Sequence, residues 1–202
     1  MQTGQITSNI LIGGIGFTSA VTRTAEGQIS HVVALPPGLA GAISADGVDG
    51  LATGHGLQAA DVIDLHWTAS GEQKCRRGIR VDTAGANAVT FDDDPAAEGD
   101  ALPAVDTAVV VGKQVSIDTL WDGDEVEMIA ARAASGGVID FRKDDGSSAL
   151  AVKMVGSEAW SWVSGQSVNN PFAGLSLASI RASNSGTASS TLHIGVLYQS
   201  VA

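Results

Sequence analysis

Short runs of β-branched and aromatic residues recur along this chain, and Gly, Asp, Asn or Ser follows each run within a few positions. Such runs favour extended strands, and the polar and glycine clusters between them favour tight turns. This pattern predicts an all-β protein. The clearest runs are residues 61–67 (DVIDLHW), 88–91 (AVTF), 107–111 (TAVVV), 138–142 (VIDFR) and 192–198 (LHIGVLY).

The composition indicates how such a protein is packed. Hydrophobic residues make up 44% of the 202 residues, but aromatic residues only 4%, so the cores must consist mainly of Val, Ala, Ile and Leu. The 25 glycines exceed the usual share of about 7%. Many of them stand where a strand would reverse, which predicts turns rather than a disordered glycine-rich tract.

The spacing of the runs predicts three parts: an N-terminal arm (1–20), a small β-barrel-like module (21–113) and a C-terminal β-sandwich of jelly-roll type (114–202). A hairpin of 15–24 and 28–35 connects the arm to the first module, and within 39–53 we expect only turns and one weak strand. Seven strand candidates follow residue 114, which is the density of a sandwich. Residues 125–132 have helical propensity, but their alternating pattern favours a strand.

The charge of the chain excludes one class of partner. Acidic residues number 22 and basic residues 11, giving a net charge of −11, whereas proteins that bind nucleic acid neutralise phosphates with Lys and Arg. The only basic cluster, residues 74–80 (KCRRGIR), is interpreted as a solvated strand edge in preference to a phosphate contact. Residues 10–17 (ILIGGIGF) are too few to span a bilayer and follow no basic region, so we expect no membrane partner and no N-terminal secretory signal.

No set of residues in the sequence has the spacing of a catalytic or metal-binding motif. Cys75 is the only cysteine, which rules out an internal disulfide and favours a small buried residue over a nucleophile. The four histidines, His31, His55, His66 and His193, lack the mutual spacing of a zinc site. We therefore expect no catalytic residue, no metal and no cofactor, and we expect that the protein is not an enzyme.

Two acidic segments leave alternatives open. Asp92, Asp93 and Asp94, with Glu98 and Asp100, could supply oxygen ligands to Ca²⁺, but a solvated turn is favoured because the spacing is not that of a calcium loop. Residues 122–125 form a second, weaker acidic turn with the same interpretation. A hydrolase that uses a carboxylate from each segment is the least favoured hypothesis, since nothing in the sequence brings the two together.

An apolar segment and a pair of tryptophans are the candidates for an interface. Trp160 and Trp162 fall on the same face of a strand, where they could fill the core, form a platform for sugars or meet another subunit. The apolar segment near the N-terminus is expected to be ordered by a neighbouring subunit. The candidate interface residues are Ile10, Leu11, Ile12, Ile15, Phe17, Trp160 and Trp162.

Two stretches of the chain resemble a known kind of protein. The C-terminal stretch 122–198, from DGDEVEMIAARAASGG to LHIGVLY, and the middle stretch GHGLQAADVIDLHW…RRGIRVDTAGANAVTFDDD are similar to virion structural proteins of bacteriophages and prophages, of the head-decoration or accessory capsid type. The resemblance implies a non-enzymatic protein that is made in the host cytoplasm and incorporated into the virion. Its partners would be the major capsid protein or other virion proteins, and its own copies, with a trimer as one arrangement.

Two alternatives to capsid decoration stay open at this point. The same β modules serve in phage tails, so the chain could be a tail or baseplate component. A β-sandwich with paired tryptophans is also compatible with a carbohydrate-binding or adhesin-like module, which would be distinguished by the exposure of the two rings.

Overall fold

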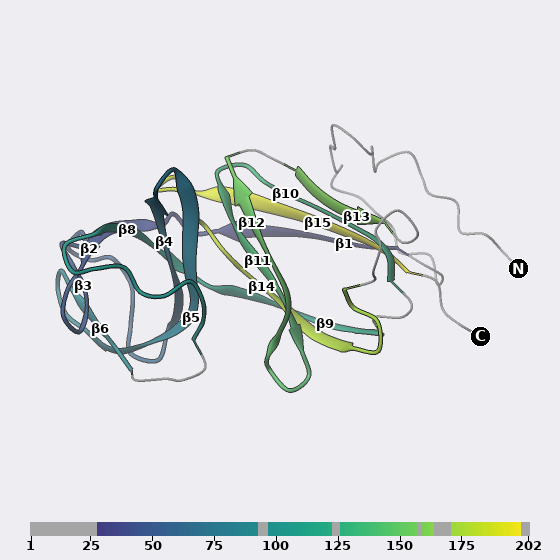
Figure 1. Ribbon diagram of the computed structural model, residues 1–202, viewed down its shortest axis with the longest axis horizontal. Coiled ribbons are helices and arrows are strands. Elements are labelled where there is room, and N and C mark those ends of the chain that lie inside the picture. The colour runs from purple at the N-terminus through teal and green to yellow at the C-terminus, as the bar shows by residue number, and fades with distance from the viewer. Residues whose placement is uncertain (1–27, 93–96, 123–125, 157–158, 164–170, 199–202) are drawn as a thin grey trace, which may run out of the picture. The chain divides into compact units, whose positions relative to one another are not determined.

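The computed structural model describes residues 28–92, 97–122, 126–156, 159–163 and 171–198 (Figure 1). These residues contain fifteen strands and no helix, which confirms the all-β prediction. Accordingly, the described part of the chain includes no helix that is long and apolar enough to cross a membrane. The chain divides into two compact units, which we call the barrel unit (35–115 and 182–190) and the two-sheet unit (1–34, 116–181 and 191–202).

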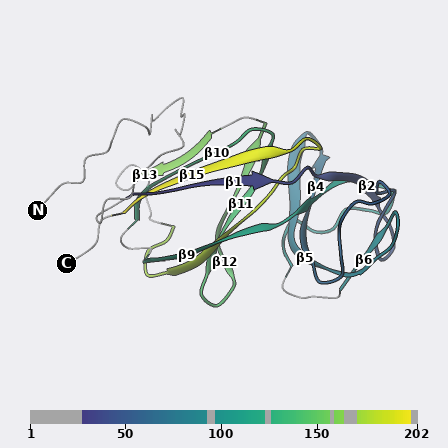
Figure 2. The ribbon, with the colours of Figure 1, turned by 180° about the vertical axis from the view of Figure 1, so that it is seen from behind.

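The barrel unit contains a closed ring of six antiparallel strands. Following hydrogen-bonded neighbours, the order is β4-β8-β2-β3-β6-β5, and β5 pairs with β4 to close the ring. Figure 2 shows β4 and β5 side by side from behind. Closure leaves no free edge in the ring, which agrees with the predicted small barrel. Its strands are β2 (Leu39–Ile43), β3 (Gly47–Asp49), β4 (Val62–Ala69), β5 (Glu72–Ala84), β6 (Val89–Phe91) and β8 (Ala108–Lys113), and the short β7 (Glu98–Gly99) pairs with the outer part of β5.

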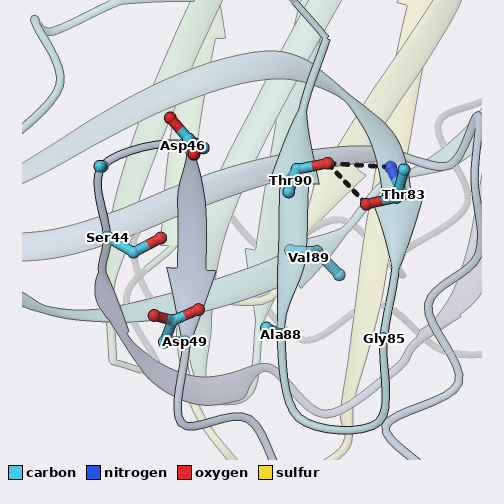
Figure 3. A pocket seen from close by; sticks show the side chains of 9 residues that line it. Ser44, Asp46, Asp49, Thr83, Gly85, Ala88, Val89 and Thr90 are labelled. Carbon is cyan, nitrogen blue, oxygen red and sulfur yellow. Dashed lines mark hydrogen bonds between the residues drawn. The ribbon is translucent and has the colours of Figure 1, made fainter.

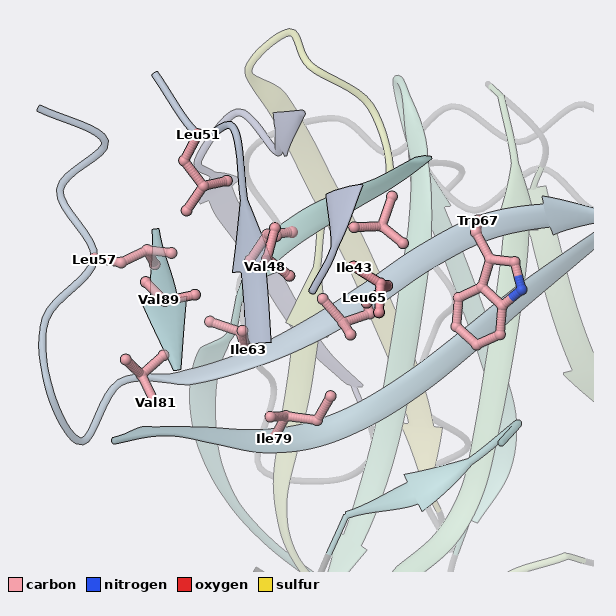
Figure 4. Packing of buried hydrophobic residues seen from close by; sticks show 12 residues of the cluster. Ile43, Val48, Leu51, Leu57, Ile63, Leu65, Trp67, Ile79, Val81 and Val89 are labelled. Atoms are coloured by element: carbon pink, nitrogen blue, oxygen red, sulfur yellow. The ribbon is translucent and has the colours of Figure 1, made fainter. Parts of the chain in front are cut away.

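The barrel is filled by side chains from one face of each strand. On β4, Ile63, Leu65 and Trp67 point inward at every second position, as the period of a strand requires. Each large aliphatic side chain that is fully buried contributes about 1.5–3 kcal/mol to stability. Figure 4 shows how the core residues converge from different strands and from the loop between β3 and β4. The cluster consists of Ile43, Val48, Leu51, Leu57, Ile63, Leu65, Trp67, Ile79, Val81, Val89, Val109 and Val111.

The two-sheet unit consists of two four-stranded sheets. One has the order β1-β15-β10-β13 and the other β12-β11-β14-β9. Ring contacts join them, because Phe141 of β11 lies 6.1 Å from Trp160 of β13 and 5.3 Å from Phe172, measured between ring centroids. The strands are β1 (Gln28–Leu35), β9 (Val115–Asp122), β10 (Val126–Ala133), β11 (Gly136–Lys143), β12 (Ser148–Val155), β13 (Ala159–Val163), β14 (Ser176–Ser183) and β15 (Ser190–Tyr198).

The structure corrects one prediction about the strands, confirms a second, and does not describe the residues of a third. Residues 39–53 contain two strands, β2 and β3, rather than one, because each gains a ladder partner that is distant in sequence, β8 and β6 respectively. Residues 125–132 largely coincide with the strand β10, so the choice of strand over helix is confirmed. The predicted arm 1–20 and the strand 15–24 lie outside the described residues.

The two units also divide the chain differently from the predicted boundaries at 21–113 and 114–202. The strand 28–35 was assigned to the barrel-like module, but β1 pairs with β15 in the two-sheet unit. Residues 182–190 were assigned to the sandwich, but they belong to the barrel unit. Both differences arise from contacts between segments that are distant in the sequence, which the local spacing of strands does not reveal.

Gly47, the first residue of β3, packs so closely against β6 that a larger residue should destabilise the barrel. A Cβ atom on Gly47 would lie 1.9 Å from the carbonyl oxygen of Val89, whereas a Cβ on Gly85, in the β5–β6 turn, would meet nothing closer than 3.5 Å. We expect Gly47→Ala to lower the free energy of unfolding by about 1–3 kcal/mol, as overpacking does, and Gly85→Ala to change it by less than about 0.5 kcal/mol. Urea denaturation measures both, and equal stability of the two variants would contradict the described β3–β6 contact.

Candidate functional site

Four polar side chains form a buried cluster on the barrel unit. Asp64 and His66 alternate with the inward-facing Ile63, Leu65 and Trp67 of β4, so they occupy the opposite face of that strand. They are only 1% and 4% exposed, and Cys75 of β5 is 1% exposed. The last member is Ser183, the final residue of β14, which is fully buried. We call these residues the Asp–His–Cys–Ser cluster.

An irregularity in the β4–β5 pairing places Cys75 in this cluster. Ile63 pairs with Ile79, but Leu65 pairs with Arg76, so the single residue Asp64 faces two residues of β5. One of these is Gly78, whose φ of 72° suits a β-bulge because glycine adopts positive φ without strain. A regular register continued from Ile79 would place Cys75 opposite the inward-facing Trp67. The bulge shifts the pairing by one residue, and Cys75 pairs with His66 instead.

Asp64 accepts hydrogen bonds from three uncharged donors. The backbone N–H of Gly78 and the side-chain amide of Gln114 donate to Oδ1 at 2.9 and 2.6 Å, and the hydroxyl of Ser183 donates to Oδ2 at 2.5 Å. Burial raises the pKa of the Asp64 carboxyl above its ordinary value, although these hydrogen bonds oppose the shift. The carboxylate is therefore held firmly in place in surroundings that disfavour its charge.

Ser183 connects Asp64 to His66, but not in the order of a catalytic triad. Its Oγ lies 3.0 Å from His66 Nε2 while its hydrogen points to Asp64. In a Ser–His–Asp triad the acid holds the imidazole and the imidazole takes the serine proton. Here the carboxylate takes the serine hydrogen bond itself, and the hydroxyl is fully buried. The serine proton is thus directed to the carboxylate and not to the imidazole that would take it in a triad.

The barrel unit also has a polar pocket lined by residues of β3, β5, β6 and the turns beside them. Figure 3 shows Ser44, Asp46 and Asp49 on one side of it and Thr83 and Thr90 on the other. The backbone N–H and the hydroxyl of Thr83 lie 3.1 and 2.7 Å from Thr90 Oγ. The pocket has a volume of about 420 Å³ and no aromatic side chain in its lining. Its lining combines hydroxyl and carboxylate groups with the small apolar side chains of Ala45, Ala88 and Val89.

The tryptophan pair predicted from the sequence lies against the other sheet. Trp162 is 7% exposed and meets Phe172 edge-on, with ring centroids 5.8 Å apart, and Trp160 is half-buried. The two rings thus share one face of β13 and pack against other aromatic rings, and the sugar-binding alternative stays a prediction. Their assignment to a subunit interface stays a prediction. The other candidate interface residues, Ile10, Leu11, Ile12, Ile15 and Phe17, lie outside the described residues.

The described residues of the acidic segment 92–100 contact the basic segment 74–80. Glu98 lies 3.4 Å from Arg77, and Asp100 accepts a hydrogen bond of 2.8 Å from the backbone N–H of Cys75. Lys74 pairs with Glu72 at 2.6 Å. The basic segment 74–80 therefore lies on β5, as predicted, with neighbouring acids beside it. Asp93 and Asp94 of the first acidic segment, and residues 123–125 of the second, lie outside the described residues.

Sequence analysis missed the Asp–His–Cys–Ser cluster because it compared histidines only with other histidines. A usable signal was present: in D-x-H both side chains fall on one face of a strand, and a cysteine follows on the next strand of the same hairpin. Ser183 is 117 residues from His66 in sequence and gave no comparable signal.

Comparison with known proteins supplies no relative: no protein family, no curated protein and no solved structure matches this chain.

The hydroxyl of Ser183 is expected to stabilise the fold. Ser183→Ala would leave Asp64 Oδ2 and His66 Nε2 buried without their shared partner, at a cost of about 1–3 kcal/mol. Ser161→Ala, on the exposed side of β13, is the matched control and should change stability by less than about 0.5 kcal/mol. Chemical denaturation of both variants tests this expectation, and a Ser183→Ala protein as stable as the control would show that the bridge contributes nothing.

Proposed function

We propose that the chain is a non-enzymatic structural protein of a bacteriophage particle, which decorates or cements the capsid in many copies through contacts with the major capsid protein and with itself. The observation that carries the proposal is the strand order of the two-sheet unit. The resemblance of stretches 54–94 and 122–198 to phage virion proteins points the same way.

We infer that the two-sheet unit is a β-sandwich with jelly-roll topology. Counted along the chain, its first, eighth, third and sixth strands form one sheet, and its fifth, fourth, seventh and second form the other. That is the order of an eight-stranded jelly roll. The pairings of β10 with β13 and β15, and of β11 with β12, are antiparallel, as this topology needs. Jelly rolls recur in viral capsid proteins and also in lectins, so the step from fold to particle is an analogy at the level of the fold.

The outer strands of the two sheets offer a way to bind further chains. Among the described residues, β1 and β13 pair on one side only in the first sheet, and so do β12 and β9 in the second. An unpaired strand edge can accept a strand from another molecule. Val32 on β1 and Val155 on β12 are 48% and 49% exposed, so apolar side chains accompany these edges. We place the self-contact at β1, because the apolar segment 10–17 precedes that strand in the chain.

A role without catalysis is supported by the chemistry of the candidate sites. The Asp–His–Cys–Ser cluster is at most 5% exposed at each member, and the lining of the polar pocket contains no His, Cys or Lys. The net charge of −11 keeps copies apart in solution unless a local contact overcomes the repulsion. Edge pairing between strands is such a local contact.

Quantitative mass spectrometry of purified phage particles that encode this chain tests the proposal. We expect tens to hundreds of copies per particle, in a fixed ratio to the major capsid protein. A handful of copies would assign the chain to the tail or baseplate instead of the shell. Absence from washed particles would overturn the proposal.

The self-contact is tested by a charge on the exposed edge. Val32→Lys puts an ammonium group on β1, which opposes pairing with a second chain, and should raise the dissociation constant of the homo-oligomer about tenfold or more. Val155→Lys, at the same exposure on β12, is the matched control and should leave it unchanged. Sedimentation equilibrium of the full chain gives both constants. A wild-type chain that stays monomeric at high concentration, or two variants that behave alike, would contradict a contact at β1.

A further inference from the structure

Asp64 lacks a charged hydrogen-bond partner. All three of its donors, Gly78 N–H, the Gln114 amide and the Ser183 hydroxyl, are neutral groups. The guanidinium of Arg77 on the next strand acts on Asp64 through space without a hydrogen bond to it, and its ion pair is with Glu98. Buried carboxylates in proteins are normally paired with a cation or bound to a metal ion. A cation within the cluster would therefore complete the surroundings of Asp64.

The cluster contains the ligand atoms for such a cation. A carboxylate oxygen of Asp64, an imidazole nitrogen of His66 and the thiol sulfur of Cys75 all lie within 4.8 Å of one another. With zinc bonds of about 2.0–2.3 Å, two ligands of one tetrahedral ion are about 3.3–3.8 Å apart. The most distant pair of ligand atoms would need to approach by roughly 1–1.5 Å to coordinate one ion.

We propose that Asp64, His66 and Cys75 bind one Zn²⁺ ion, which acts as a structural metal of the barrel. A carboxylate and a thiolate together balance the two positive charges, so the buried site is neutral as a whole. A mixed set of oxygen, nitrogen and sulfur ligands suits zinc better than the oxygen-preferring Mg²⁺ or Ca²⁺. Because each ligand side chain is at most 4% exposed, the site has the closed character of structural zinc sites.

Residues beside the three proposed ligands form hydrogen bonds that hold the ligand side chains in position. Gly78 N–H and the Gln114 amide fix the orientation of the Asp64 carboxylate, and ligating carboxylates are usually held in this way. A carboxylate has about four lone-pair positions, and the three hydrogen bonds leave one for a metal. Gly112 lies beside the imidazole of His66. Any other residue there would bring its Cβ to 3.1 Å from His66 Nε2, so the glycine keeps that space open. Ser183 Oγ, 2.5 Å from Asp64 Oδ2 and 3.0 Å from His66 Nε2, is the neighbouring oxygen available as a further ligand.

A metal-free alternative makes a different use of the same residues. If His66 carried the positive charge, Ser183 would connect it to Asp64 as a hydrogen-bonded ion pair, and no metal would be needed. Cys75 distinguishes the two arrangements, because its sulfur binds the ion in one and has no part in the other.

Cobalt substitution tests the proposal directly. The full chain is unfolded with chelator to remove bound metal, freed of the chelator, and refolded with one equivalent of Co²⁺. Because Cys75 is the only cysteine, an intense near-ultraviolet band from thiolate-to-cobalt charge transfer can arise only at this site. We expect that band and a content of one metal ion per chain. With Zn²⁺ at a hundred times its dissociation constant, we expect the Tm of the refolded chain to rise by about 5–10 °C.

Variants separate a built site from adventitious binding. Cys75→Ser should abolish the band, and Asp64→Asn should weaken metal binding at least tenfold, while His31→Gln, on β1 of the other unit, should leave both unchanged. Size-exclusion chromatography and circular dichroism verify that each variant is folded. A folded wild-type chain with no thiolate–cobalt band would overturn the proposal, whatever metal its exposed carboxylates bind.

Discussion

The pairing of β4 with β5 is the contact on which most of the barrel unit depends. It closes the ring of six strands, and its bulge at Gly78 decides which side chains of β5 share a face with those of β4. On the inner face, Ile63 and Leu65 belong to the core. On the outer face, the same two strands bring Asp64, His66 and Cys75 together. One glycine with positive φ thus links the closure of the barrel to the assembly of its polar cluster.

The Asp–His–Cys–Ser cluster is covered by residues 182–190, which lie far from β4 and β5 in the sequence. Asn184 donates its side-chain amide to the carbonyl oxygens of Pro36 and Ala188 at 3.0 and 2.6 Å, and Gly38 N–H donates to the carbonyl of Gly186 at 2.8 Å. These bonds hold residues 182–190 in the barrel unit and so keep Ser183 beside Asp64. A polar cluster that lies outside a hydrophobic barrel can therefore still be fully buried.

Local sequence patterns predicted the strands better than they predicted their partners. The alternation in 61–67 and the Asp-Gly turns place most strands within one or two residues, because strand period and turn chemistry are local. The pairing of β1 with β15 and the position of 182–190 depend on contacts across most of the chain, which no local pattern encodes. The cluster was missed for a similar reason: the role of Cys75 depends on a one-residue shift in register.

The shift in register at Gly78 is tested most directly by a disulfide between paired positions. Directly paired residues of an antiparallel ladder are close enough for such a bond. In the bulged register, His66→Cys should form a disulfide with Cys75 in the oxidised, folded protein, whereas Trp67→Cys should not. Peptide mass spectrometry of the two oxidised proteins identifies the bond. A disulfide in Trp67→Cys and none in His66→Cys would mean that β4 and β5 pair without the bulge, and that the Asp–His–Cys–Ser cluster is not assembled as described.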